Sequence, residues 1–206
     1  MGTAEDLIEC TRELLWERGY VGTSPKAIQQ RAGVGQGSMY HHFTGKPGLA
    51  LAAITRTAQE MRASAEARFT APGTPVERVA AYLRGEREAL GGCPVGRLSQ
   101  DADVMADPVL RAPVVEALDW LRGRLAELLS QGRERGELRP GLDPEATADT
   151  ITAVLQGSCA LTRAAGSGEP FADAVDGILA VLAAAPVPAA AAASAAEPAE
   201  SAPGPG

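Results

Sequence analysis

Short polar side chains gather in a segment punctuated by glycines, QQRAGVGQGSMYHHFTGK at positions 29–46 of this 206-residue chain. Amide, hydroxyl and imidazole groups near the start of a helix are the donors and acceptors that read base edges in the major groove of DNA. The residues that we expect to face bases are Gln36, Gly37, Ser38, His41 and His42. The residues suited to DNA phosphates are Thr23, Ser24, Lys26, Tyr40 and Lys46.

The charge of the chain is unevenly distributed. Its formal net charge of −7 argues, as an average, against a nucleic-acid partner. Yet none of its 26 acidic residues lies between Gly19 and Gln59. The cations in that window are Lys26, Arg31, Lys46 and Arg56, so the window carries +4 and the rest carries −11. Unless the gap in acidic residues is due to chance, this pattern indicates that one face of the protein can bind a polyanion.

Two short helices are needed to present these side chains. Ser24 and Pro25 form a helix start, with the serine as cap and the proline in the first turn. Gly33 permits the positive φ that reverses the chain, and a second helix follows Gly35 and runs to about Phe43. This spacing predicts a helix-turn-helix. The apolar residues expected to join its helices are Ile28, Ala32, Val34, Met39 and Phe43.

The segment ERGYVGTSPKAIQQRAGVGQGSMYHHFTGKPGL, positions 17–49, resembles the signature of the TetR family of bacterial transcriptional repressors. The resemblance implies a three-helix DNA-binding domain, a helical ligand-binding core, a homodimer built on the last two helices, and release from a double-stranded operator by a small-molecule effector. GGCPVGRLSQD, at 91–101, resembles the LmrA-like branch, whose members regulate multidrug-efflux genes. Departures from the family pattern are Gly35 in place of a serine cap, Gln36 in place of a cation, and Pro47-Gly48 in place of helix-forming residues.

We predict an all-α fold of about nine helices, because strand alternation is scarce and a 3.6-residue period recurs throughout. The first helix is expected to open with Thr3 and close at Arg18-Gly19. After the helix-turn-helix the expected helices are 46–69, 75–90, 96–106, 108–135, 144–165 and 169–185, with a break at TAPGTP, 70–75. The predicted domains are 1–46 for DNA binding, 47–185 for ligand binding and dimerisation, and 186–206 as a disordered Ala/Pro-rich tail.

The ligand pocket is the part that the sequence defines least. Six residues are candidates by their places on the expected helices: Tyr82, Leu98, Asp101, Met105, Trp120 and Leu155. Ordinary core packing is the alternative for each of them. Nearby carboxylates, if they face the pocket, favour a cationic aromatic ligand; they belong to Asp101, Asp103 and Asp119.

The expected dimer contact lies on the 144–165 helix and on the apolar face from Phe171 to Leu182. One side of the first of these helices carries Ala148, Ile151, Leu155 and Ser158, and the small residues Gly157 and Ala160 permit close approach of a partner helix.

Other function classes find little support. Both histidines lie in the proposed recognition helix, so no Ser/His/Asp, Cys/His or metal set is formed, and we predict no cofactor, no metal and no catalysis. Metal binding by His41-His42, a packing role for Tyr40 and Trp16, and a redox role for Cys93 are alternatives. No signal or membrane segment is evident, which favours the cytoplasm. The competing hypothesis is a ligand-binding helical protein or enzyme with a vestigial helix-turn-helix.

Overall fold

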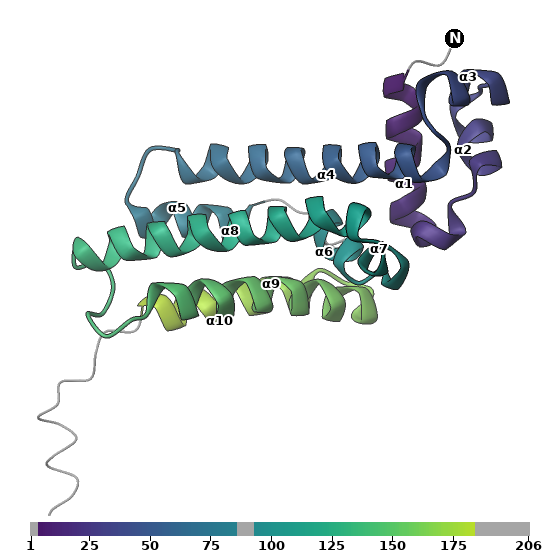
Figure 1. Ribbon diagram of the computed structural model, residues 1–206. Helices are drawn as coiled ribbons and strands as arrows, with labels where there is room; N and C mark the ends of the chain where they lie inside the picture. Colours follow the sequence, from purple (N-terminus) through teal and green to yellow (C-terminus); the bar gives the residue numbers. More distant parts are fainter. Residues whose placement is uncertain (1–3, 86–92, 184–206) are drawn as a thin grey trace, which may run out of the picture.

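A computed structural model describes residues 4–85 and 93–183 and contains ten α-helices and no strand in those ranges. Figure 1 shows α1, α2 and α3 packed together at one end of the molecule, with the longer helices extending away from them in layers. Their bounds are Ala4–Gly22 (α1), Pro25–Ala32 (α2), Gln36–His42 (α3), Lys46–Phe69 (α4), Pro75–Arg84 (α5), Pro94–Ser99 (α6), Ala102–Ala106 (α7), Pro108–Glu134 (α8), Pro144–Ala165 (α9) and Glu169–Ala183 (α10).

The helix starts follow from local capping chemistry. Side-chain oxygens of Ser24, Thr74, Asp101, Asp107 and Asp143 accept backbone N–H groups in the first turns of α2, α5, α7, α8 and α9. A proline occupies an early position of α2, α5, α8 and α9, where its missing N–H removes no helical hydrogen bond. The predicted all-α fold and the break at 70–75 are confirmed, since α4 ends at Phe69 and α5 begins at Pro75.

Three expected boundaries were wrong or incomplete. The helix predicted for 96–106 is two helices, because Asp101 has extended backbone angles (φ −83°, ψ 110°) and caps α7, which raises the count above nine. Gly19, at φ 71°, interrupts α1 as predicted, but a further helical turn continues to Gly22. The helix expected at 75–90 ends at Arg84. Three predicted parts lie outside the described residues: Thr3, positions 86–90 of the predicted helix, and the tail at 186–206.

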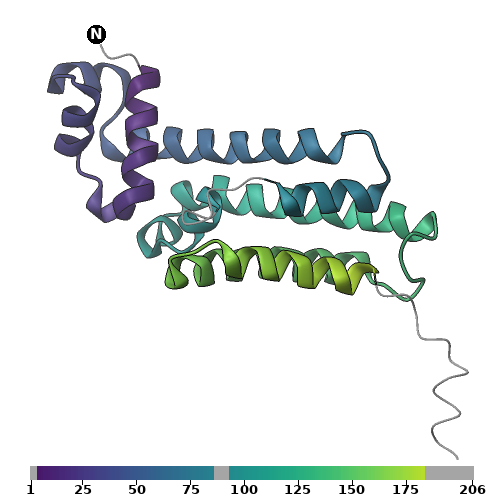
Figure 2. The ribbon, with the colours of Figure 1, turned by 180° about the vertical axis from the view of Figure 1, so that it is seen from behind.

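The helix α4 connects the two parts of the molecule. Its first turn contributes Leu49 to an N-terminal apolar cluster with Leu7, Leu14, Ile28 and Met39. Farther along, Ala53 and Ile54 belong to a second cluster, and Ala65 and Phe69 to a third. Figures 1 and 2 both show α4 beside α8, with α9 and α10 paired on the opposite side of α8. The predicted boundary at residue 46 coincides with the start of this shared helix.

The side of α9 predicted to form the dimer is covered by the chain itself. The fully buried residues on it, exposed by 2% or less, are Ala148, Ile151, Leu155 and Ser158. Val175, Ile178 and Leu182 of α10 pack in the same core cluster. These α9 and α10 residues are therefore buried within the protomer and cannot form the predicted dimer contact in this conformation, because hydrophobic periodicity marks a buried face without saying what buries it. The exposed side of the two helices carries Gly157 and Ala160, which the prediction also named, together with Leu161, Gly177, Ala180 and Val181.

No helix in the ranges 4–85 and 93–183 is long and apolar enough to cross a bilayer.

Candidate nucleic-acid interface

The predicted helix-turn-helix is formed by α2 and α3. Ser24 Oγ accepts the N–H of Ala27 at 3.1 Å and caps α2. Gly33 adopts the left-handed conformation (φ 64°), and its N–H bonds to the carbonyl of Gln29, which also accepts the N–H of Val34. The chain therefore reverses within a few residues, as the glycine pattern predicted.

One face of this motif is buried and the other is open. Ile28 and Met39 are both 0% exposed, with Ala32, Val34 and Phe43 partly buried against their cluster. The residues on the open face are Gln36, Gly37, Tyr40, His41 and His42, and Ser38 is half-buried. The outward face that base reading requires is thus present, although base contact itself stays a prediction.

The two glycines at the start of α3 have free space around them. A Cβ atom built on Gly35 or Gly37 meets no other atom within 4 Å, and neither residue has a positive φ. Gly35 caps α3 without a side-chain hydrogen bond, as expected from the loss of a serine there. The fold of this chain therefore does not require glycine at Gly37, and any requirement must come from a partner.

The residues predicted to contact phosphates differ in how exposed they are. Ser24 and Lys26 are exposed at the first turn of α2. Thr23 is only 1% exposed and its hydroxyl donates to the carbonyl of Gly19 at 2.8 Å. We therefore correct its assignment from phosphate contact to a structural role, because a side chain covered by its own chain cannot reach DNA in this conformation.

Lys46 begins α4 and is half-buried. Its Nζ lies 4.0 Å from the ring centroid of Tyr20, a cation–π distance. Burial lowers the pKa of Lys46, while the nearby carboxylates of Asp101 and Asp103 act in the opposite direction. The ammonium group thus helps to hold the end of α1 against the start of α4, and phosphate contact by Lys46 stays a prediction.

The acid-free window is partly neutralised in three dimensions. Both guanidinium nitrogens of Arg31 bond to the Glu17 carboxylate, at 2.7 and 2.8 Å, and Glu13 lies 3.4 Å away. Arg56 pairs with Glu5 at 2.6 Å. Two of the four cations are therefore engaged by acids of α1. The four-residue spacing of Glu13 and Glu17, which puts both on one helix face, was the signal for this that the sequence contained.

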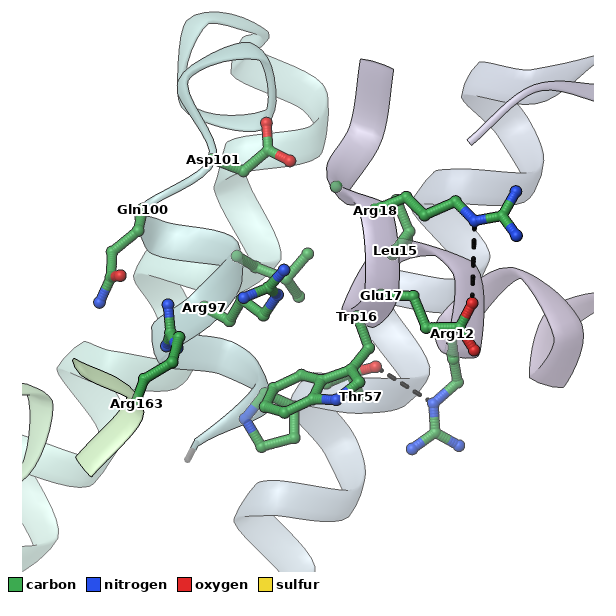
Figure 3. Close-up of a pocket in the computed structure, with 13 residues that line it drawn as sticks. Arg12, Leu15, Trp16, Glu17, Arg18, Thr57, Arg97, Gln100, Asp101 and Arg163 are labelled. Carbon is green, nitrogen blue, oxygen red and sulfur yellow. Dashed lines mark hydrogen bonds and ion pairs between the residues drawn. The ribbon is translucent and has the colours of Figure 1, made fainter. Parts of the chain in front are cut away.

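Two cavities border α1. The larger, of about 480 Å³, is lined by α1, α4 and α5 together with Cys93 and Pro94. The smaller, of about 310 Å³, lies where α1 meets α6, and we call it the joint cavity (Figure 3). Trp16 lines both cavities. The sequence left packing and ligand contact as alternative roles for this residue, and its side chain forms part of the wall of each cavity.

The six residues predicted to bind ligand do not line a single cavity. Tyr82 borders the larger cavity, and Leu98 and Asp101 border the joint cavity. Leu155 is a core residue, and Met105 and Trp120 are partly buried against core clusters. Helix periodicity identified buried positions correctly but could not say which of them border empty space.

The carboxylates thought to favour a cationic ligand are otherwise engaged. Asp101 accepts the N–H groups of Tyr20, Asp103 and Val104. Asp103 is exposed beside it, and Asp119 pairs with Arg122 at 3.2 Å. The acidic side chains that border the larger cavity come from α1 and α4: Glu9, Glu13, Glu17 and Glu60. In the described part of the chain, no group of three or more His, Cys, Asp or Glu residues is arranged to hold a metal ion.

Comparison with known proteins agrees with this architecture. The family model for bacterial regulatory proteins of the tetR family matches residues 7–53, and that for the tetracyclin repressor-like C-terminal domain matches residues 74–178. A TetR transcriptional regulator from Chloroflexus aurantiacus superposes with a TM-score of 0.79 at 28% identity, covering 86% of this chain and 92% of the other.

Two curated relatives match over most of the chain. The HTH-type transcriptional repressor DhaR of Mycobacterium sp. (strain GP1) is 26% identical, over 81% of this chain and 85% of its own length. The HTH-type transcriptional regulator LmrA of Bacillus subtilis is 23% identical, over 81% and 89%. Since the LmrA match does not exceed the DhaR match, these similarities do not single out one branch.

Proposed function

The chain belongs to the TetR family of bacterial regulatory proteins, and from that premise we propose that it is a dimeric transcriptional repressor, released from a pseudo-palindromic operator by a small molecule. The observation that carries this proposal is the exposed face of α3, whose polar side chains stand on a helix fixed by a buried apolar cluster. Polar groups on a rigid helix are what major-groove recognition requires.

Within this proposal, base reading falls to Gln36, Ser38 and His41, with His42 at the end of the same helix. A glutamine can bond adenine with two hydrogen bonds, so Gln36 contributes sequence preference. Ser24, Lys26, Tyr40 and Lys46 would hold the phosphate backbone around it. Gln36→Ala should change base preference, whereas Tyr40→Phe or Lys46→Ala should weaken all sequences alike.

The second protomer would pack on the exposed side of α9 and α10. Leu161 is 60% exposed and Val181 55% exposed, and small residues surround them: Gly157, Ala160, Gly177 and Ala180. Small residues allow helices of two protomers to approach closely, and exposed leucine and valine gain from burial. A two-fold dimer predicts operator half-sites roughly 34–36 Å apart, or a multiple of that spacing.

The proposed effector is a small hydrophobic molecule that binds in the larger cavity. Met61, Tyr82 and Trp16 supply polarisable and aromatic surface there. The lining of this cavity includes four glutamates and two arginines, a net charge of −2, which supports the cationic aromatic class. Control of an efflux or drug-resistance gene follows from the LmrA-like resemblance alone and belongs to the proposal.

A gel-shift titration with the DNA upstream of the chain's own gene and of its neighbours tests the proposal. We expect a specific complex at nanomolar protein whose affinity falls steeply with salt. Addition of planar aromatic cations should then release the DNA. Absence of any salt-dependent specific complex would contradict the repressor assignment, and a protein that binds ligands without DNA would support the vestigial helix-turn-helix instead.

A further inference from the structure

The joint cavity lies between the two parts of the molecule. Trp16 and Leu15 of α1 form one wall, and Arg97 and Leu98 of α6 form the facing one. Arg163 reaches the cavity from near the C-terminal end of α9. Figure 3 shows Arg97, Gln100 and Arg163 on the core side, across from the residues of α1. With about 310 Å³ of space, the cavity is at the small end of the range for ligand pockets.

Four arginines line this cavity, and they differ in what neutralises them. Arg12 pairs with Glu9 and Glu60 and donates to Thr57. Arg18 lies 3.8 Å from a carboxylate oxygen of Glu17. For the other two, Arg97 and Arg163, no carboxylate in residues 4–85 or 93–183 lies within ion-pair distance. Two guanidinium groups therefore keep their donors available for an anion.

The acids at the cavity do not compensate these two cations. Glu17 is held by both guanidinium nitrogens of Arg31 on α2. Asp101 directs its carboxylate oxygens to three backbone N–H groups. Because both carboxylates are already engaged, the electrostatic balance of the cavity favours a negatively charged occupant.

The walls also define the uncharged part of an occupant. The guanidinium carbon of Arg97 lies 5.4 Å from the ring centroid of Trp16, so a flat cationic group and a flat aromatic ring stand together. Leu15, Leu98 and Pro94 add apolar surface. A carboxylate carried on a small aromatic or aliphatic body matches this combination, since the fork of an arginine bonds a carboxylate with two parallel N–H groups.

We propose that the joint cavity is a binding site for a small organic carboxylate, held by Arg97 and Arg163 with its apolar body against Trp16. This site adjoins the larger cavity given to the hydrophobic effector and shares Trp16 with it, but Arg97 and Arg163 line the joint cavity and not the larger one. An occupant contacts α1 of the DNA-binding part and α6 of the core at once, so it stabilises one placement of the two parts. Its binding does not depend on whether the proposed repressor function is correct.

Calorimetric titration of the DNA-free full chain with three isosteres tests the site: benzoate, benzamide and benzylamine. We expect saturable benzoate binding with a dissociation constant below about 10 mM, a modest affinity for so few atoms. Benzamide and benzylamine should bind at least about tenfold more weakly, because a charge-assisted bond to arginine is lost. The indole N–H resonance of Trp16 should shift with benzoate.

Three variants locate the binding. Arg163→Gln removes an exposed side chain that forms no ion pair within residues 4–85 and 93–183, so the fold should be retained, and affinity for benzoate should fall about tenfold or more. Arg97→Gln should have the same effect. Arg122→Gln is the matched control, since Arg122 is an α8 arginine paired with Asp119 and Asp149 and lies outside the cavity lining. No saturable benzoate binding, equal affinity for benzamide, or unchanged binding in Arg163→Gln would overturn the proposal.

Discussion

One oxygen of the Asp101 carboxylate accepts the backbone N–H of Tyr20 at 2.7 Å and so joins the core to the DNA-binding part. The other oxygen caps α7 by accepting the N–H groups of Asp103 and Val104. Gly19, next to Tyr20, is at φ 71°, and a Cβ atom there would lie 2.9 Å from that first oxygen. The glycine thus permits both the backbone turn and the close approach of Asp101.

Asp101→Asn tests this connection. An amide retains one oxygen, so either the cap or the bond to Tyr20 loses an acceptor, and we expect a loss of about 1–2 kcal/mol in unfolding free energy. Amide hydrogen exchange at Tyr20 should accelerate, and operator affinity should change. Asp107→Asn is the control, because Asp107 caps α8 through Val109 and Leu110 alone. Equal effects of the two variants on operator affinity would contradict a connecting role for Asp101.

Gly37→Ala separates a folding requirement from a DNA requirement. A methyl group at Gly37 meets no protein atom, and alanine is the better helix former, so stability should rise by about 0.5–1 kcal/mol. If α3 approaches DNA closely, operator affinity should nevertheless fall, which fluorescence anisotropy measures. Gly123→Ala on α8, with equally free space, should give the same gain in stability and leave DNA binding unchanged. Unaltered affinity in Gly37→Ala would remove this glycine from the interface.

Most of the helix-turn-helix could be predicted from the sequence, whereas the position and lining of the cavities could not. Ser24, Gly33 and Met39 follow local rules for caps, left-handed turns and helix faces, so their places were predictable. The pairing of Arg31 with Glu17 depends on how α1 crosses α2, and the joint cavity depends on where α6 meets α1. Such relations arise from tertiary packing. Ser158 illustrates the same limit, because helix periodicity placed it on a face without revealing the chain's own core behind it.

Glu17→Gln should increase the positive charge available to DNA. Glu17 engages both guanidinium nitrogens of Arg31, and this hydrogen bonding lowers the pKa of Glu17, so the pair persists at neutral pH. Neutralising Glu17 leaves Arg31 with the more distant carboxylate of Glu13, 3.4 Å away, as its remaining acidic partner. Arg31 can then contact a phosphate, and DNA affinity should rise at low salt with a slope steeper by up to about one unit in log–log salt titrations. Glu127→Gln, which removes one of the two carboxylates paired with Arg124 of α8, is the control. A decrease of affinity in Glu17→Gln would indicate that the pair positions α2 instead.

Leu161→Glu and Val181→Glu test the proposed dimer surface. Both side chains are more than half exposed in the protomer, so a carboxylate there should leave the protomer folded, as circular dichroism can verify. Buried between protomers, the same carboxylate would be desolvated without a partner, so light scattering should report monomers.

Val115→Glu, at an α8 position 40% exposed, is the control that should stay dimeric. Leu155→Glu, on the side first predicted from periodicity, should unfold the protomer because Leu155 is 1% exposed. If Leu161→Glu and Val181→Glu remain dimeric, the contact between protomers lies elsewhere. If they become monomeric and also lose affinity for an operator with two half-sites, this surface is required for DNA recognition by the dimer.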